Sequence, residues 1–200
     1  ETLRPGLDFA SQDYLSLAAH PAIRAAASDP LPTSVALELN SRLAAFLQLP
    51  VVATFASGTD AIRQTLGTLL RPGDEVIVLS PYWVSYPEMV RFAGGVVVEV
   101  ETLPEEGFVP DPERVRRAIT PRTKALVVNS PNNPTGAVYP KEVLEALAKL
   151  AVEHDFYLVS DEIYEHLLYE GEHFSPGRVA PEHTLTVNGA AKAFAMTGWR

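Results

Sequence analysis

The chain has 200 residues, of which 46% are hydrophobic and 20% charged, a composition typical of a soluble globular protein. Its formal net charge of −9 argues against nucleic-acid and anionic-membrane partners, because such surfaces bind clustered lysine and arginine. The absence of cysteine excludes disulfides, thiolate chemistry and cysteine-ligated metals. With no apolar run long enough to cross a membrane and no basic, hydrophobic leader, we expect a soluble cytoplasmic protein that needs no metal.

Residues 1–50 are expected to form an N-terminal arm followed by helices. The first 20 residues show no clear period and predict an ordered arm. An alanine-rich segment at 21–28, with Pro21 at the first helical position, predicts a short helix. A second helix is predicted over 35–47, where apolar residues follow helical spacing after a possible cap at Thr33 or Ser34.

Residues 51–200 alternate strand and helix patterns and are expected to form one large domain. The predicted strands are 51–55, 75–79, 96–100, 124–129, 156–160 and 184–187. The predicted helices are 60–70, 86–92, 111–119 and 140–154. Repeated βα units of this length predict an α/β fold with three layers (αβα), in which a mostly parallel sheet carries helices on both faces.

Two of these strands end near groups that suit cofactor chemistry. Asp161 directly follows an apolar strand, where a buried carboxylate needs a compensating cation or hydrogen-bond donors. Lys192 follows the last strand in a Gly/Ala-rich loop, where partial desolvation favours the nucleophilic amine. Together they suggest a pyridoxal 5'-phosphate site, in which the lysine forms a Schiff base and the acid pairs with the ring nitrogen. The alternatives are a helix cap for Asp161 and an ordinary surface role for Lys192.

Four further signals suit the same cofactor. The turn Ser57-Gly58-Thr59 joins a strand to a helix start, which can bind phosphate, although small residues at such a position more often form only a tight turn with a cap. Trp83 follows a strand and could stack on a ring or merely cover the core. Asn133, in a loop rich in asparagine and proline, could donate to a phenolate oxygen. The forked guanidinium group of Arg200 is suited to binding phosphate, but a terminal arginine is usually just solvated.

Taken in chain order, these signals resemble the fold-type I pyridoxal-phosphate enzymes. Residues 74–200 resemble the large domain of prokaryotic class I aspartate aminotransferases. The motifs that carry this resemblance are Gly73-Asp74-Glu75-Val76, Ser80-Pro81-Tyr82-Trp83, Asn132-Asn133-Pro134-Thr135-Gly136, Asp161-Glu162-Ile163-Tyr164 and the run from Lys192 to Arg200.

The resemblance implies a role for each candidate residue. Catalysis falls to Lys192, Asp161 and Tyr164, with Lys192 forming the Schiff base and moving a proton. Asp161 is expected to pair with the ring nitrogen, Trp83 to stack on the ring, and Asn133 and Tyr164 to hold its phenolate oxygen. The phosphate ligands implied are Ser57, Gly58, Thr59 and Arg200.

The N-terminal third departs from that family. Residues 7–27 resemble the α-oxoamine synthases, and residues 37–66 resemble those synthases or the sugar aminotransferases. The C-terminal small domain, which supplies the arginine for the substrate carboxylate in the family, is expected to be absent. We therefore expect a truncated, mosaic or engineered large domain.

The activity implied is transfer of an amino group from an amino acid to a 2-oxo acid by a homodimer, as in aspartate aminotransferases. One alternative is a scaffold that binds pyridoxal phosphate without useful turnover. The other is an acyl transfer like that of the α-oxoamine synthases. That group usually places histidine over the ring, so Trp83 counts against it.

Overall fold

The computed structural model describes residues 33–47, 51–55 and 57–197 of the chain. The predicted arm, the predicted helix at 21–28 and Arg200 lie outside these residues. The chain divides into two compact units, one made of residues 62–189 and the other of residues 1–61 with 190–200. The division into an N-terminal part before residue 51 and one domain after it stays a prediction. No helix in the described ranges is long and apolar enough to cross a membrane.

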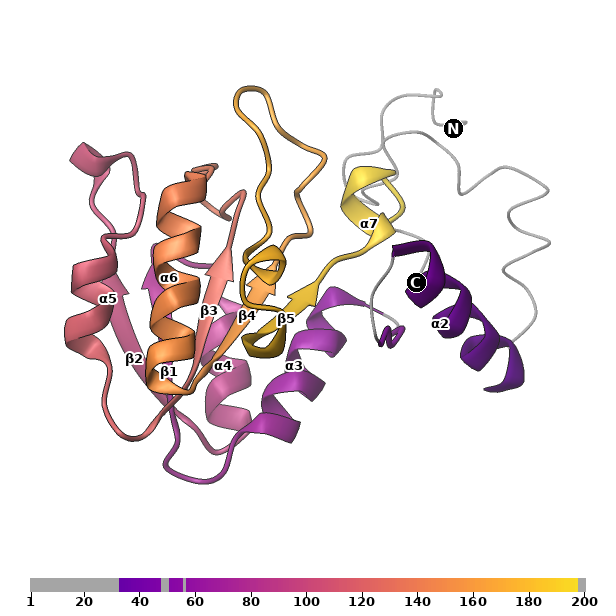
Figure 1. The fold of residues 1–200 in the computed structure, drawn as a ribbon, viewed down its shortest axis with the longest axis horizontal. Helices are drawn as coiled ribbons and strands as arrows, with labels where there is room; N and C mark the ends of the chain where they lie inside the picture. Colours follow the sequence, from indigo (N-terminus) through magenta and orange to yellow (C-terminus); the bar gives the residue numbers. More distant parts are fainter. Residues whose placement is uncertain (1–32, 48–50, 56, 198–200) are drawn as a thin grey trace, which may run out of the picture. The chain divides into compact units, whose positions relative to one another are not determined.

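Residues 62–189 are built on a sheet of five strands, all parallel, in the order β2-β1-β3-β4-β5 (Figure 1). The strands are β1 Glu75–Ser80, β2 Val96–Glu101, β3 Thr123–Asn129, β4 Tyr157–Asp161 and β5 Thr184–Val187. These five predictions are confirmed to within one residue at each end, because apolar, β-branched runs between turn signals are typical of buried parallel strands.

Helices cover both faces of the sheet. They are α3 Gly58–Leu69, α4 Ser85–Phe92, α5 Pro112–Ala118 and α6 Lys141–His154, and three short 3-10 turns lie at Pro104–Glu106, Pro176–Arg178 and Pro181–His183. Alternate strand residues such as Ile77 and Leu126 pack with α5 and α6 in one buried cluster. Their neighbours Val76 and Val127 are just as buried on the opposite face, where Figure 1 shows α4. The three-layer α/β prediction is confirmed.

Local sequence signals explain where several helices begin and end. The Asp111 carboxylate accepts a hydrogen bond from the Glu113 N–H at 2.9 Å, with Pro112 in the first helical turn, as predicted for α5. Gly94 ends α4 with a φ of +83°. A Cβ on the next residue, Gly95, would lie 2.9 Å from the Leu70 Cδ1 atom, so glycine permits close packing there.

The second unit contains α2 Thr33–Leu47 and α7 Ala190–Ala193. The helix predicted over 35–47 is confirmed. The strand predicted over 51–55 is wrong, because this segment pairs with no other described strand and Val51 stays 79% exposed. A β-branched run becomes a strand only where a neighbour accepts its hydrogen bonds. The loop expected around Lys192 is instead the short helix α7, consistent with the high helix propensity of alanine.

Candidate functional site

The carboxyl ends of the five parallel strands meet along one edge of the sheet, and most candidate residues follow them. From β1 the chain passes to β2 on one side and then crosses to β3, β4 and β5 on the other. The strand order therefore reverses between β1 and β3, the position at which open α/β sheets bind ligands. The loop with Trp83 follows β1, and the loop with Asn133 follows β3, so both flank this reversal.

Asp161 ends β4 and is only 6% exposed. Its Oδ2 atom accepts a hydrogen bond from the Tyr86 hydroxyl at 2.7 Å, and its Oδ1 atom accepts one from the Ile163 N–H at 3.2 Å. Burial raises the pKa of the Asp161 carboxyl above its usual value, while the Tyr86 hydrogen bond opposes that rise. The second hydrogen bond closes a turn, and the alternative of a helix cap for Asp161 is wrong, because residues 162–168 form no helix.

Asn129, the last residue of β3, connects Asp161 to the asparagine-rich loop. Its Nδ2 atom donates to the Asp161 carbonyl oxygen at 3.0 Å, and its Oδ1 atom accepts from the Asn133 N–H at 2.8 Å. The parallel register places Asn129 beside Asp161 and Asp161 beside Val187. One buried amide thus fixes the main chain of two neighbouring strand ends and of the loop that carries Asn133.

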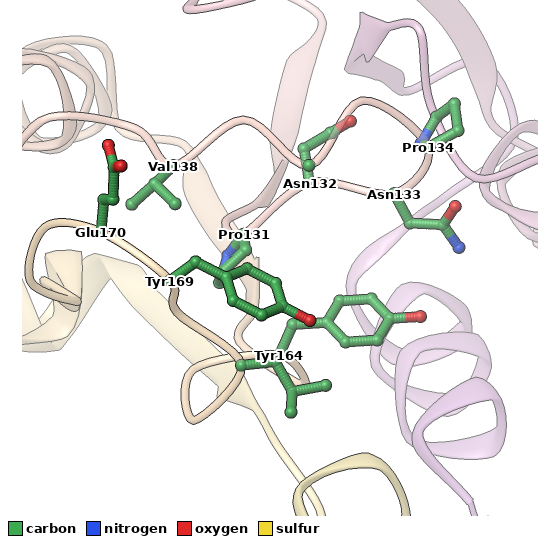
Figure 2. A pocket seen from close by; sticks show the side chains of 10 residues that line it. Pro131, Asn132, Asn133, Pro134, Val138, Tyr164, Tyr169 and Glu170 are labelled. Carbon is green, nitrogen blue, oxygen red and sulfur yellow. The ribbon is translucent and has the colours of Figure 1, made fainter.

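The loop after β3 and the segment after β4 line an open hollow of about 540 Å³ at the surface (Figure 2). Asn132, Asn133 and Pro134 line it from the first segment, and Tyr164 and Tyr169 from the second. Among the described residues, the side-chain amide of Asn133 has no hydrogen-bond partner, so it can donate to a ligand. The Asn132 carboxamide instead shapes the loop, since its oxygen accepts from Thr135 at 2.9 Å.

A buried network holds the segment after β4 against the end of that strand. The Glu162 carboxylate accepts hydrogen bonds from the Ser160 hydroxyl at 2.8 Å and the Ser175 hydroxyl at 2.7 Å. Its second oxygen lies 2.8 Å from the His173 Nε2 atom, and Glu165 Oε2 lies 3.8 Å from the same nitrogen. These contacts fix both ends of the segment that contains Tyr164.

The Ser57-Gly58-Thr59 turn begins α3, in agreement with the local alternative of a helix cap. The Ser57 Oγ atom accepts a hydrogen bond from the Asp60 N–H at 3.1 Å. A Cβ placed on Gly58 would meet no atom of the described residues within 4 Å, so none of these residues requires glycine there. An N-terminus of this kind can bind phosphate, and that role for the turn stays a prediction.

The structure brings together four of the predicted site residues within the unit 62–189, namely Trp83, Asn133, Asp161 and Tyr164. Trp83 meets Tyr86 edge to face, with ring centres 5.4 Å apart, and Tyr86 in turn contacts Asp161. Ser57, Gly58, Thr59 and Lys192 belong to the other unit, in which Lys192 is a half-buried residue of α7. Arg200 lies outside the described residues, so the full set stays a prediction.

Sequence reasoning missed Tyr86 and Asn129. Tyr86 resembled an ordinary apolar core residue of its helix, but it lies one helical turn after Trp83, which was a usable signal. Asn129 ends an apolar strand with a polar side chain just as Asp161 does. Neither partner could be assigned, because the two contacts join residues 75 and 32 positions apart in the chain.

These residues fit a planar ring that carries a protonated nitrogen and a phenolate oxygen. The buried Asp161 carboxylate can accept from a cationic N–H, which would offset its burial. The Asn133 amide and the Tyr164 hydroxyl are donors suited to an anionic oxygen. Trp83 supplies an aromatic surface at the same edge of the sheet.

The sequence model of the protein family described as aminotransferase class I and II matches residues 6–200 of this chain. Aspartate/prephenate aminotransferase of Thermus thermophilus is 92% identical over 143 residues, which cover 72% of this chain and 37% of that protein. An aspartate aminotransferase of Bacillus sp. strain YM-2 is 52% identical over 136 residues, covering 66% of this chain and 35% of that protein.

Solved structures agree with these relatives. The aspartate aminotransferase of Thermus thermophilus with maleate matches with a TM-score of 0.72 at 91% identity, covering 72% of this chain and 38% of that one. An alanine aminotransferase from Pyrococcus furiosus matches with a TM-score of 0.70 at 44% identity, and the match covers 72% of this chain and 37% of that one. The chain therefore spans little more than a third of the length of the relatives that it matches.

Proposed function

Because this chain belongs to the class I and II aminotransferase family, we propose that it binds pyridoxal phosphate and transfers amino groups between amino acids and 2-oxo acids. The names of its relatives favour substrates of the aspartate type. The resemblance of residues 74–200 to the large domain of these enzymes supports the same conclusion. The arrangement at the carboxyl edge of the sheet provides an independent physical reason.

The buried Asp161 is the observation that carries this proposal. A carboxylate that is 6% exposed, and whose hydrogen bonds come from a hydroxyl and a backbone amide, gains most from a cationic partner. Pyridoxal phosphate, when bound, acts as an electron sink whose capacity depends on protonation of its ring nitrogen. Asp161 is therefore assigned the ring nitrogen, and Trp83 is assigned one face of the ring.

The remaining candidates bind and orient the other groups of the cofactor. Asn133 and Tyr164 would donate to the phenolate oxygen, which suits their position around the hollow after β3 and β4. The turn at residues 57–59 and Arg200 would hold the phosphate. The Lys192 Nζ atom would attach the cofactor covalently and carry the proton removed from the substrate Cα atom.

A reaction with L-aspartate tests the proposal. The 200-residue chain is mixed with pyridoxal phosphate, L-aspartate and 2-oxoglutarate, and the appearance of oxaloacetate and the absorbance of the bound cofactor are followed. We expect turnover, and we expect Lys192→Ala to abolish both turnover and the absorbance of the attached cofactor. Lys149→Ala is the matched control, because the Lys149 side chain is 74% exposed on α6.

The outcomes separate the competing functions. An unchanged spectrum in Lys192→Ala would refute the lysine assignment. A Lys192-dependent spectrum without oxaloacetate would favour a binding scaffold over an aminotransferase. Consumption of an acyl thioester with an amino acid, in place of 2-oxoglutarate, would favour the acyl transfer of an α-oxoamine synthase.

We also propose that the protein acts as a homodimer, as the family resemblance suggests, and that it does so in the cytoplasm, which suits a chain without cysteine. Sedimentation equilibrium of the chain with and without pyridoxal phosphate tests the dimer. A monomer at every concentration would contradict it.

A further inference from the structure

Tyr86 connects two residues to which the proposed function assigns contacts with the cofactor ring. It is 2% exposed, lies on α4 and donates its hydroxyl to the Asp161 Oδ2 atom at 2.7 Å. Its ring meets that of Trp83 at an interplanar angle of 86°. The Tyr86 N–H also donates to the Trp83 carbonyl oxygen at 3.1 Å, so the two residues are fixed by main chain as well as side chain.

The hydroxyl has a specific effect on the acid. Each oxygen of the Asp161 carboxylate accepts one hydrogen bond, Oδ2 from Tyr86 and Oδ1 from the Ile163 N–H, so the plane of the group is fixed. A hydrogen bond to a charged acceptor is stronger than one between neutral groups. Burial and the neighbouring Glu162 raise the pKa of Asp161, and the Tyr86 hydroxyl opposes them.

The hydroxyl is the donor in this pair. Burial, followed by the charge of Asp161, the hydrogen bond to Asp161 and then the smaller effects of Tyr164 and Tyr139, raises the pKa of Tyr86 well above its usual value. Tyr86 therefore keeps its proton and donates it to the hydrogen bond, in which the Asp161 Oδ2 atom is the acceptor. A ligand nitrogen that must stay protonated requires such an acceptor carboxylate beside it.

We propose that Tyr86 is a positioning residue of the cofactor site, which orients the Asp161 carboxylate, keeps it ionised toward the ring nitrogen and supports Trp83 through its ring. The inference rests on the proposed function and extends it to a residue that contacts the acid rather than the cofactor. A purely structural hydrogen bond would contribute to folding but would leave the charge of Asp161 and its affinity for a cationic ring unchanged.

The first test needs no cofactor. The pKa of Asp161 is measured by carbon-detected NMR titration of its carboxyl group in the unmodified chain, in Tyr86→Phe and in Tyr157→Phe. Phenylalanine keeps the ring and its packing against Trp83 and removes only the hydroxyl. Tyr157 begins β4, at the opposite end of the strand from Asp161, and is the matched control. We expect a higher pKa in Tyr86→Phe alone, and an unchanged value would overturn the inference.

The second test measures the dissociation constant of pyridoxal phosphate by quenching of tryptophan fluorescence. Loss of a hydrogen bond to a buried charged group predicts binding weaker by roughly tenfold or more in Tyr86→Phe. Asp161→Asn should also weaken binding. If Tyr86 acts through Asp161, Tyr86→Phe should then have little further effect in the Asp161→Asn background.

The two tests distinguish this inference from the proposed function. Equal losses of affinity in the presence and absence of the Asp161 carboxylate would show that Tyr86 does not act through it. Normal Lys192-dependent binding in Tyr86→Phe would overturn the inference and leave the proposed function intact. Failure of the unmodified chain to bind pyridoxal phosphate would overturn both, while the NMR titration would still show whether Tyr86 controls Asp161.

Discussion

Replacing Asn129 by alanine should destabilise the fold, because one buried amide joins two strand ends and a loop. Asn129 is 4% exposed, donates to the Asp161 carbonyl at 3.0 Å and accepts from the Asn133 N–H at 2.8 Å. The Asp161 carbonyl would keep its hydrogen bond from the Ser130 N–H at 3.4 Å, whereas the Asn133 N–H would lose the acceptor that Asn129 provides. One or two lost hydrogen bonds and a partly buried orphan donor predict a loss of about 2–3 kcal/mol in the free energy of unfolding.

Urea unfolding of the chain, followed by far-UV circular dichroism, measures this loss. Asn188→Ala is the matched control, because Asn188 is exposed and contacts Glu165 at the surface. A substitution of that kind should change the free energy of unfolding by no more than about 0.5 kcal/mol. If Asn129→Ala and Asn188→Ala had equal free energies of unfolding, the two side-chain hydrogen bonds of Asn129 would not stabilise the strand ends and the loop.

Two further predictions concern the sheet. Leu126→Ala, at a fully buried position of β3, should cost about 2–5 kcal/mol in urea unfolding, whereas Leu185→Ala, at a 37% exposed position of β5, should cost far less. Glu75→Gln should destabilise the fold at pH 7, because the Thr120 hydroxyl and then the Arg122 guanidinium lower the pKa of Glu75 below its ordinary value of 4.5. A lowered folded-state pKa gives stability that is present above pH 4.5 and lost as the pH falls through the folded value. The difference in the free energy of unfolding between Glu75→Gln and the unmodified chain should therefore be smaller in acid. An equal difference at pH 7 and pH 3 would contradict this prediction.

The fold was largely predictable because its strands are short apolar runs separated by strong turn signals. β1 follows Pro72-Gly73-Asp74, and Asp111-Pro112 starts α5, so local chemistry alone places both elements. The segment 51–55 shows the limit of this reasoning. Its β-branched residues predict a strand, but pairing depends on a neighbour that a local pattern does not reveal.

The candidate site was predictable only where a residue type was unusual for its position. Asp161 and Asn133 stood out because polar groups follow buried strands. Tyr86 did not, because a tyrosine on the apolar face of a helix is typical of a core residue. Its hydroxyl acquires a role only through a partner 75 positions away, and such a distance is a property of the folded chain.

The two buried acids of the sheet show why the carboxyl edge is the better candidate for ligand binding. Glu75, at the amino end of β1, is 3% exposed and accepts from the Arg122 Nε atom at 2.9 Å, so a cation within the fold compensates it. Asp161, at the carboxyl end of β4, is equally hidden but is held by a hydroxyl and an amide, which bring no net charge. The pKa values shift accordingly, downward for Glu75 and upward for Asp161. A carboxylate that is fixed in orientation but not neutralised favours a positively charged ligand, and a protonated ring nitrogen meets that requirement.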